Sequence, residues 1–211
     1  MATILELTNL VEKFIIERDW QRFHNPKNEA VNILVEATEL AERFAEEEWG
    51  SLDPIADELA DVLCGILLFA NFNQYDLAQL VGQVLQDRLL NNQTAQFAEF
   101  ELKIWKSRAV LDLECEGSSE RMILLVREAG KLVDLFIWCT DQQSYEIVQK
   151  KRDYIAQRLL RMVGHLVILS YLIGLDLAEE LQRKLQVNAK KYPVGLASGD
   201  GYAALKDACR G

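Results

Sequence analysis

Apolar residues recur along this chain at the three- and four-residue spacing of amphipathic helices, and no segment alternates as a strand would. The pattern predicts helices at about residues 3–23, 27–49, 54–73, 76–112, 118–140, 142–173 and 176–191. The three prolines, at positions 26, 54 and 193, lie where helices are expected to begin or end. Asn91 to Gln93 predict a kink or break in the long helix 76–112. The predicted fold class is therefore all-α, a helical bundle.

Two acidic pairs stand inside this apolar pattern. Glu36-Ala-Thr-Glu39 and Glu58-Leu-Ala-Asp61 each have the i, i+3 spacing that places two carboxylates on one helix face. Four anions on facing helices repel one another, and a hard divalent cation with oxygen ligands removes that repulsion. The residues Glu36, Glu39, Glu58 and Asp61 therefore predict a site for Mg²⁺, with Mn²⁺ as a possible substitute, that handles phosphate groups.

The composition narrows the class of protein. A net charge of -10 and a pI near 4.8 argue against binding nucleic acid through its phosphates. The four cysteines have no C-x-x-C spacing, which argues against a zinc site or a disulfide framework. The start of the chain has no basic leader, and the apolar stretch Met162 to Leu175 is too short to cross a bilayer. We expect a cytoplasmic protein without a membrane partner.

The chain contains a weak internal repeat. Ile55 to Ala78 aligns with Ile155 to Ala178 at an offset of one hundred, and Leu34 to Leu40 aligns with Val126 to Leu132. The alignment predicts a first repeat over residues 1–92 that carries the metal site and a degenerate second repeat over 93–194 packed on it. Residues 195–211 are expected to form a loose tail, with a short helix at 202–209.

The acidic positions change character in the second copy. Lys131, Arg158 and Arg161 stand where the first copy has Glu39, Glu58 and Asp61, and Glu128 alone stays acidic. We expect Glu128 to pair with these cations, so that the second copy holds no metal. Cationic and amide side chains near the last helix end survive only in the second copy, at Lys184, Asn188 and Lys191. Each copy is therefore expected to contribute one side of a single composite site.

An ordered set of motifs resembles a known family. The set comprises Arg18-Asp-Trp20-Gln-Arg-Phe23-His24-Asn-Pro26-Lys-Asn28, the two acidic pairs and Asn188-Ala-Lys-Lys191-Tyr192-Pro193. It resembles the all-α NTP pyrophosphatases of the MazG-like and dCTP pyrophosphatase group, over residues 10–77 and, as a diverged copy, 120–194. The resemblance implies Mg²⁺-dependent cleavage of a nucleoside triphosphate to the monophosphate and pyrophosphate, as in removal of surplus or noncanonical nucleotides. Members are symmetric dimers or dimers of dimers, so two MazG-like repeats would form a pseudo-dimer in one chain, and the chain a homodimer.

That reaction assigns a role to each candidate residue. A carboxylate of the Glu36 and Glu39 helix is the expected general base, and Lys184 and Lys191 are expected to stabilise the leaving pyrophosphate. The remaining substrate-binding candidates are Trp20, Phe23 and His24 for the base, Asn28 for the base or ribose, and Asn188 and Tyr192 as hydrogen-bond donors. Gly65 departs from the family, where a bulky residue often stands, and this leaves the preferred base open.

Several other interpretations remain open. The carboxylates could form a solvated face paired with Arg43 or Lys27, and Trp20 and Phe23 could be core residues. His24 could satisfy carbonyl groups at a helix end, and Lys191 could act only on a helix dipole. The protein could also be a nucleotide-binding regulatory or sensing protein with weak turnover. A ferritin-like di-metal bundle is disfavoured because neither histidine follows a glutamate by three residues.

Overall fold

The computed structural model describes residues 2–45, 50–86, 93, 95–115 and 117–198, and it confirms the all-α fold class over that part of the chain. The helices are α1 (Ile4–Ile16), η1 (Gln21–Phe23), α2 (Pro26–Phe44), α3 (Asp53–Phe72), α4 (Leu77–Val84), α5 (Phe97–Lys106), α6 (Ser118–Asp134), α7 (Asp141–Lys150), α8 (Arg152–Ile173), α9 (Leu177–Lys191) and α10 (Val194–Ala197). Among the described residues, extended pairing is limited to an isolated antiparallel bridge between Thr3 and Gln96.

Local sequence explains where most helices begin. Thr3 opens α1 with a capping box, because its side chain accepts from the Glu6 amide and the Glu6 carboxylate accepts from the Thr3 amide. Asn25 caps α2 ahead of Pro26 at the first helical position. Asp76 and Asp176 cap α4 and α9 in the same way. Two of these capped helices, α2 and α9, carry residues of the candidate site described below, whereas α3 begins at Asp53-Pro54 with no side-chain cap.

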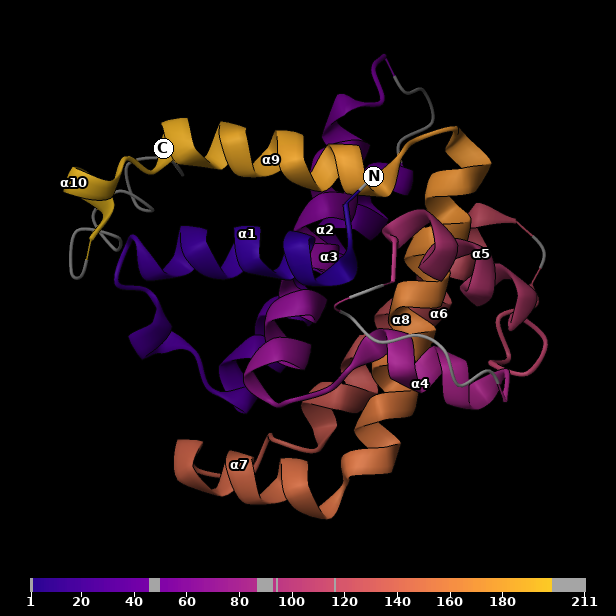
Figure 1. Ribbon diagram of the computed structural model, residues 1–211, viewed down its shortest axis with the longest axis horizontal. Helices are drawn as coiled ribbons and strands as arrows, with labels where there is room; N and C mark the ends of the chain where they lie inside the picture. The colour runs from indigo at the N-terminus through magenta and orange to yellow at the C-terminus, as the bar shows by residue number, and fades with distance from the viewer. Residues whose placement is uncertain (1, 46–49, 87–92, 94, 116, 199–211) are drawn as a thin grey trace.

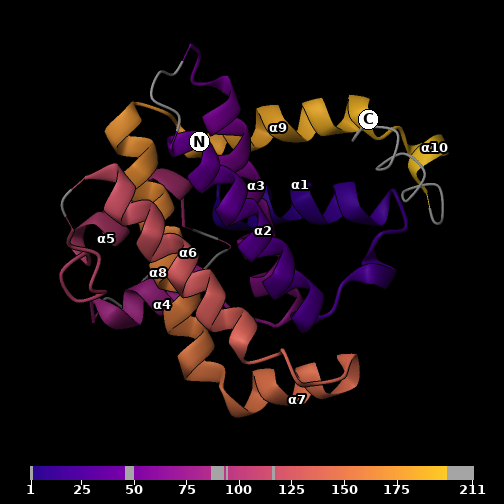
Figure 2. The same cartoon turned by 180° about the vertical axis from the view of Figure 1, so that it is seen from behind.

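The bundle is built on four long helices. α2 packs against α3 and α6, α8 packs against α6 and α3, and the apolar faces of all four form one continuous core. α1 and α9 lie side by side along α3, whereas α4 and α5 pack against α8 (Figures 1 and 2). α7 lies at the edge of the bundle and contacts α2 and α8. The last long helix, α9, therefore packs on α1 and α3 of the first half of the chain. Conversely, α4 belongs to the first half and packs on α5 and α8 of the second half.

Several predicted helix boundaries were wrong. The segment 3–23 is interrupted after Ile16, because Asp19 adopts φ 56 and ends the helical path before the short turn η1. The segment 76–112 contains two helices, α4 and α5, and its expected break at 91–93 lies mostly outside the described residues. The segment 118–140 ends as a helix at Asp134, and 142–173 is divided at Lys151, whose φ of -115 and ψ of 24 depart from helical geometry.

The C-terminal segment also differs from expectation where the structure describes it. Val194–Ala197 forms the single turn α10, and Ala197 is buried and accepts a hydrogen bond of 2.9 Å from the Trp20 indole. The first residues of the predicted loose tail are therefore docked. The short helix expected at 202–209 lies outside the described residues.

α8 is long and apolar enough, by length and composition, to cross a membrane, which the sequence pattern did not indicate. In its most apolar 18-residue window, however, 78% of the residues are buried inside the protein. The fully buried residues Leu159, Leu166 and Leu169 all belong to the core. This is the burial of a central bundle helix, whose hydrophobic surface is already covered by other helices.

Backbone features recur 93 residues apart in the first parts of the two predicted repeats. Asp19 and Asp112 both adopt positive φ, at 56 and 57 degrees, at the end of α1 and shortly after α5. The bridge beside Thr3 and Gln96 shows the same spacing, because the Ile4 amide donates to the Ala95 carbonyl and the Phe97 amide donates to the Ala2 carbonyl. Further along, Gln74 and Gly174 both have positive φ two residues before Asp76 and Asp176, the caps of α4 and α9, which is a spacing of one hundred.

Candidate functional site

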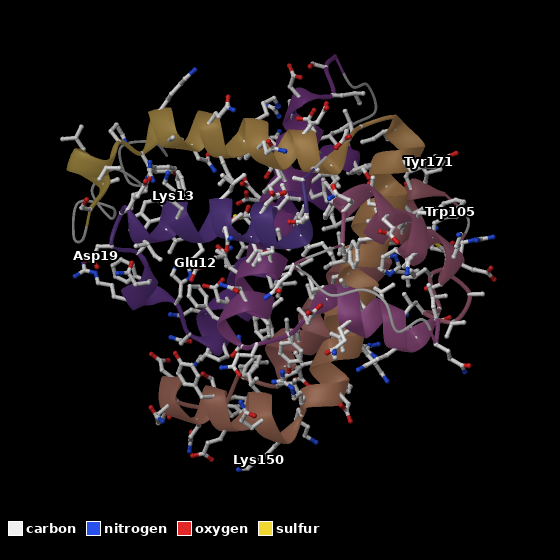
Figure 3. All side chains as sticks on the ribbon, viewed as in Figure 1. Glu12, Lys13, Asp19, Trp105, Lys150 and Tyr171 are labelled. Carbon is white, nitrogen blue, oxygen red and sulfur yellow. The ribbon has the colours of Figure 1, made fainter. Side chains whose placement is uncertain are left out.

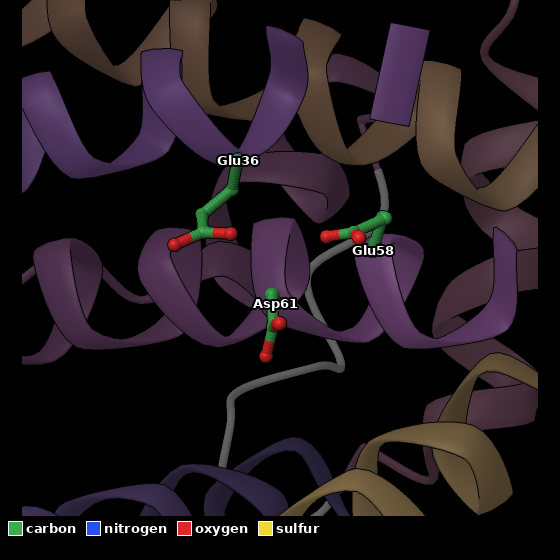
Figure 4. Close-up of side chains that lie close together, drawn as sticks. All are labelled: Glu36, Glu58 and Asp61. Atoms are coloured by element: carbon green, nitrogen blue, oxygen red, sulfur yellow. The ribbon is translucent and has the colours of Figure 1, made fainter. Parts of the chain in front are cut away.

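Three carboxylates meet where α2 and α3 pack together. Glu36 lies on α2 and Glu58 and Asp61 lie on α3, each partly buried, and Figure 4 shows their side chains approaching one another. One oxygen from each of the three lies within 4.8 Å of the others. We call Glu36, Glu58 and Asp61 the acidic cluster. Its oxygens are the ligand type that Mg²⁺ and Mn²⁺ prefer, so the residues fit such an ion.

The electrostatics of the acidic cluster call for positive charge. The pKa of Glu36 is raised to about 8 by burial and then by repulsion from Asp61, Glu39 and Glu58. Burial also raises the pKa of Glu58 and of Asp61, although Lys184 acts in the opposite direction on both. An ion held between these carboxylates would lower all three pKa values and keep the cluster ionised at neutral pH.

α9 places a lysine and an amide on the same cluster. Lys184 Nζ lies 2.8 Å from Asp61 and 3.4 Å from Asp57, and Asn188, one turn further along α9, hydrogen-bonds to Asp61. Burial lowers the pKa of Lys184, but attraction and hydrogen bonding to Asp61 outweigh it and raise the pKa above its usual value. Groups more than a hundred residues apart in sequence thus share one site.

Glu39 lies outside the acidic cluster as defined by its oxygen distances. Glu39 is exposed on α2, one turn after Glu36. Its charge nevertheless raises the pKa of both Glu36 and Glu58, so it lies close enough to act on them electrostatically. Arg43, a further turn along α2, approaches Glu58 at 3.7 Å, so one ion pair of the expected kind does form at the rim of the site.

The aromatic candidates fall into two groups. Trp20 is 9% exposed and packs edge-on against Phe14 and Tyr192, at ring distances of 5.6 and 5.4 Å. Lys191 lies over the Tyr192 ring at 5.4 Å. These residues join the end of α9 to the end of α1. The indole nitrogen of Trp20 already donates a hydrogen bond to the Ala197 carbonyl. In this arrangement Trp20 fills the core, and only the rim of the group offers surface to a base.

His24, Phe23 and Asn28 lie at the beginning of α2, away from the acidic cluster. His24 Nδ1 pairs with the buried carboxylate of Glu29, and the Asn28 amide donates at 2.9 Å to the Phe23 carbonyl, which closes the turn before α2. His24 and Glu29 line a cavity of about 270 Å³ together with Gln21, Asn25, Pro26, Phe72, Asn73 and Tyr145. Phe72 follows Asp61 by eleven residues, about 16 Å along α3, so this cavity is distinct from the acidic cluster.

Sequence reasoning missed three residues that hold α9 in place. Arg183 bridges Asp57 of α3 and Glu180 of its own helix, next to the pairing of Lys184 with Asp57. Arg18 is 2% exposed and donates at 2.8 Å to the Tyr192 carbonyl. Asp57 and Arg183 flank Glu58 and Lys184 directly in sequence, but no pattern indicated that they would meet.

In the second predicted copy, cations stand at the positions that align with Glu39, Glu58 and Asp61, and they surround Glu128. Glu128 of α6 is fully buried and pairs with Arg158 of α8, with Lys131 at 3.3 Å and with Arg161 at 3.8 Å. All three expected partners of Glu128 are therefore present. Arg127, which the sequence did not single out, is a fourth, at 3.3 Å.

Comparison with known proteins finds relatives for part of the chain. It is 34% identical over 89 residues to dCTP pyrophosphatase 1 of Bos taurus, a match that covers 37% of this chain and 53% of the relative. The same protein of Mus musculus is 33% identical over 89 residues, covering 37% and 52% of the two chains, and that of Homo sapiens 32% over 85 residues, covering 36% and 50%. The chain spans about half the length of the curated relatives it matches. No family model and no solved structure matches it.

Proposed function

We propose that this protein is a metal-dependent nucleoside triphosphate pyrophosphohydrolase that converts a nucleoside or deoxynucleoside triphosphate to its monophosphate and pyrophosphate. The observation that carries the proposal is the convergence of Glu36, Glu58 and Asp61 within 4.8 Å, with Lys184 at 2.8 Å from Asp61. The partial similarity to dCTP pyrophosphatases supports the same reaction class.

The acidic cluster would hold Mg²⁺ or Mn²⁺, with Glu39 close by. Such an ion supplies charge neutralisation of phosphate oxygens and a more acidic bound water. The protein's own groups account for the rest of the chemistry. Glu36 or Glu39 accepts the proton of the attacking water, and Glu36 is the one of the two whose oxygens lie in the acidic cluster. The ammonium group of Lys184 stabilises the charge that grows on the departing pyrophosphate.

Substrate binding is assigned to the surface that leads from the acidic cluster along α9. Asn188 is already aimed at Asp61, and Lys191 and Tyr192 extend the line toward Trp20. Asn28 lies on α2 eight residues before Glu36, about 12 Å along the helix, and His24 and Phe23 lie just before that helix, so these three candidates form a group separate from the α9 surface. We assign Tyr192 and Lys191, which lie beside the buried ring of Trp20, to the base, and Asn188 and Lys184 to the phosphates.

The two-copy organisation belongs to the proposal as well. Suppose that α1, α2, α3 and α4 of the first copy correspond to α5, α6, α8 and α9 of the second copy. Each principal helix contact then has an equivalent contact elsewhere in the bundle. The contacts α1–α3, α2–α3, α1–α9 and α3–α9 are matched by α5–α8, α6–α8, α5–α4 and α8–α4, respectively. The contacts of α2 with α6 and of α3 with α8 map onto themselves. This pattern supports an internal pseudo-dimer of residues 1–92 and 93–194, in which α4 and α9 are exchanged.

The remaining attributes of the proposed protein are its location, its partners and its assembly. The protein acts in the cytoplasm, binds a nucleotide and neither nucleic acid nor membrane, and assembles as a homodimer, which is a pseudo-tetramer of repeats. Its net charge of -10 disfavours extended phosphate polymers as ligands.

The decisive experiment is a panel of canonical and modified nucleoside triphosphates with Mg²⁺, scored for pyrophosphate against orthophosphate. Pyrophosphate and monophosphate in equal amounts support the proposal, and orthophosphate release contradicts it. Tight nucleotide binding with no turnover across the panel would favour the alternative of a regulatory or sensing protein. The matched control is Asp61→Asn, which keeps the shape of the site and removes one charge.

A further inference from the structure

A group of cations surrounds Glu128 on the opposite half of the bundle from the acidic cluster. Its members are Arg127, Lys131, Arg158 and Arg161, and we call them, with Glu128, the basic cluster. Glu128 has no exposed side-chain surface. Arg127, Lys131 and Arg161 approach the same oxygen, Oε1, at 3.3, 3.3 and 3.8 Å, while Arg158 pairs with Oε2.

The basic cluster carries more positive charge than its carboxylates neutralise. Among the described residues, the four cations form ion pairs with Glu128 and with one further carboxylate, Asp112, which lies 3.6 Å from Arg161. Two cations are therefore in excess, in a chain whose net charge is -10. Three like charges crowded on one oxygen repel one another, and a second anion placed among them would relieve that repulsion.

The basic cluster contains hydrogen-bond donors that solvent can reach, and one buried donor that has no partner among the described residues. The side chains of Arg127, Lys131 and Arg161 are 47%, 40% and 22% exposed, so an anion from solvent can reach them. Arg158 is buried beneath them, and its Nε has no hydrogen-bond partner among the described residues. Guanidinium and ammonium groups in this arrangement offer donors to several oxygens of one tetrahedral anion.

We propose that the basic cluster is a metal-free binding site for a small multivalent phosphate anion, either pyrophosphate or the phosphate groups of a nucleotide. Three of the four cations converge on one carboxylate oxygen and the fourth pairs with the other oxygen of the same carboxylate, so the site suits one or two phosphoryl groups. Under the helix correspondence given above, it occupies the position that the acidic cluster occupies on α2 and α3. Binding at this site does not depend on turnover, so it stands or falls separately from the proposed activity.

Calorimetric titration of the full chain tests the site, with sodium pyrophosphate in excess EDTA at low ionic strength. We expect one binding event per chain, weakened at least tenfold by the double substitution Lys131→Gln with Arg161→Gln. The matched control is Lys13→Gln with Lys150→Gln, which removes the same charge from two positions that are each 71% exposed (Figure 3). This control should change affinity less than twofold, and Lys184→Gln should leave binding intact.

Two results would overturn the proposal. One is the absence of pyrophosphate binding and of nucleotide binding in EDTA. The other is loss of binding in Lys184→Gln together with normal binding in the double variant, which would place the anion at the acidic cluster. Parallel titrations with a nucleoside triphosphate and with orthophosphate identify which phosphate source binds more tightly.

A second measurement on the unaltered protein covers the case in which the double variant fails to fold. Pyrophosphate in EDTA should slow modification of Lys131 by an amine-reactive reagent at least threefold, read by peptide mass spectrometry. Lys150 provides the internal reference and should react at an unchanged rate. Equal reactivity of Lys131 with and without pyrophosphate would refute the site.

Discussion

Glu36→Gln should make the metal-free protein more stable above pH 8, although it removes a side chain from the proposed active site. Burial and three neighbouring carboxylates raise the pKa of Glu36 from 4.5 to about 8. Between these two values the folded protein holds a proton that the unfolded chain has lost, so stability falls as pH rises through this window. At about 1.4 kcal/mol per pKa unit, the full interval corresponds to about 5 kcal/mol.

Part of that free energy is shared, because Glu58 and Asp61 also have raised pKa values and titrate with Glu36. We therefore expect a single substitution to recover about 2 kcal/mol, which for a chain of this size raises Tm by about 4–8 °C. The assay is thermal unfolding in EDTA at pH 5, 7 and 8.5, followed by circular dichroism. The two proteins should agree near pH 5 and diverge as pH rises.

Glu42→Gln is the control, because Glu42 lies on the same helix and is exposed. It should leave the pH dependence of Tm unchanged. Saturating Mg²⁺ should raise the Tm of the original protein, because a ligand that binds only the folded state adds stability by mass action. It should raise the Tm of Glu36→Gln much less, because this variant lacks one of the proposed ligands. Parallel curves of Tm against pH for the original protein and Glu36→Gln would refute the repulsion argument.

Three further sets of variants test the composite site. Asp61→Asn and Glu39→Gln should abolish Mg²⁺-dependent release of pyrophosphate while circular dichroism still shows a folded protein; turnover that persists in a chelator would refute a metal site. Lys184→Ala should lower kcat by about 10²-fold, because it removes a donor to charge that grows in the transition state, and Lys191→Ala should impair hydrolysis as well; unchanged kinetics in the double lysine variant would make the second half a structural brace. A fragment of residues 1–115 should aggregate or dimerise and lose activity, as judged by light scattering and the pyrophosphate assay, and full turnover by a soluble monomeric fragment would contradict the composite site.

Helical periodicity and the acidic spacing predicted the parts of the site that depend on one helix at a time. The i, i+3 spacing placed Glu58 and Asp61 on one face of α3. Between helices, the alignment of the two copies predicted three of the four cations around Glu128 and missed Arg127. The helix ends were less predictable, because Asp19 and Lys151 leave helical geometry at positions that the apolar periodicity does not mark. The pairing of Asp57 with Arg183 could not be predicted either, since it depends on how α9 lies on α3 and on no local pattern.

The role of Trp20 could not be predicted from the sequence either. Its place in the motif suggested a platform for a base, and the structure instead places it in the core against Phe14, Tyr192 and the turn α10. The carbonyl that satisfies its indole belongs to Ala197, 177 residues away. A contact of that range carries no periodic signature in the sequence, so spacing alone could not distinguish a core aromatic from a binding one.

Under the proposed two-copy organisation, α4 and α9 are exchanged between the two halves of the bundle, and this has a consequence for how such a protein can change. In a symmetric homodimer, every substitution appears in both sites at once, so a change that removes a metal ligand from one site removes it from the other. Within one chain, Arg158 can replace an acid on α8 while Glu58 persists on α3. Because α9 crosses to the half that retains its acids, Lys184 can complete that site without its counterpart on α4. Joining the two halves in one polypeptide therefore permits two sites of opposite charge on a single scaffold.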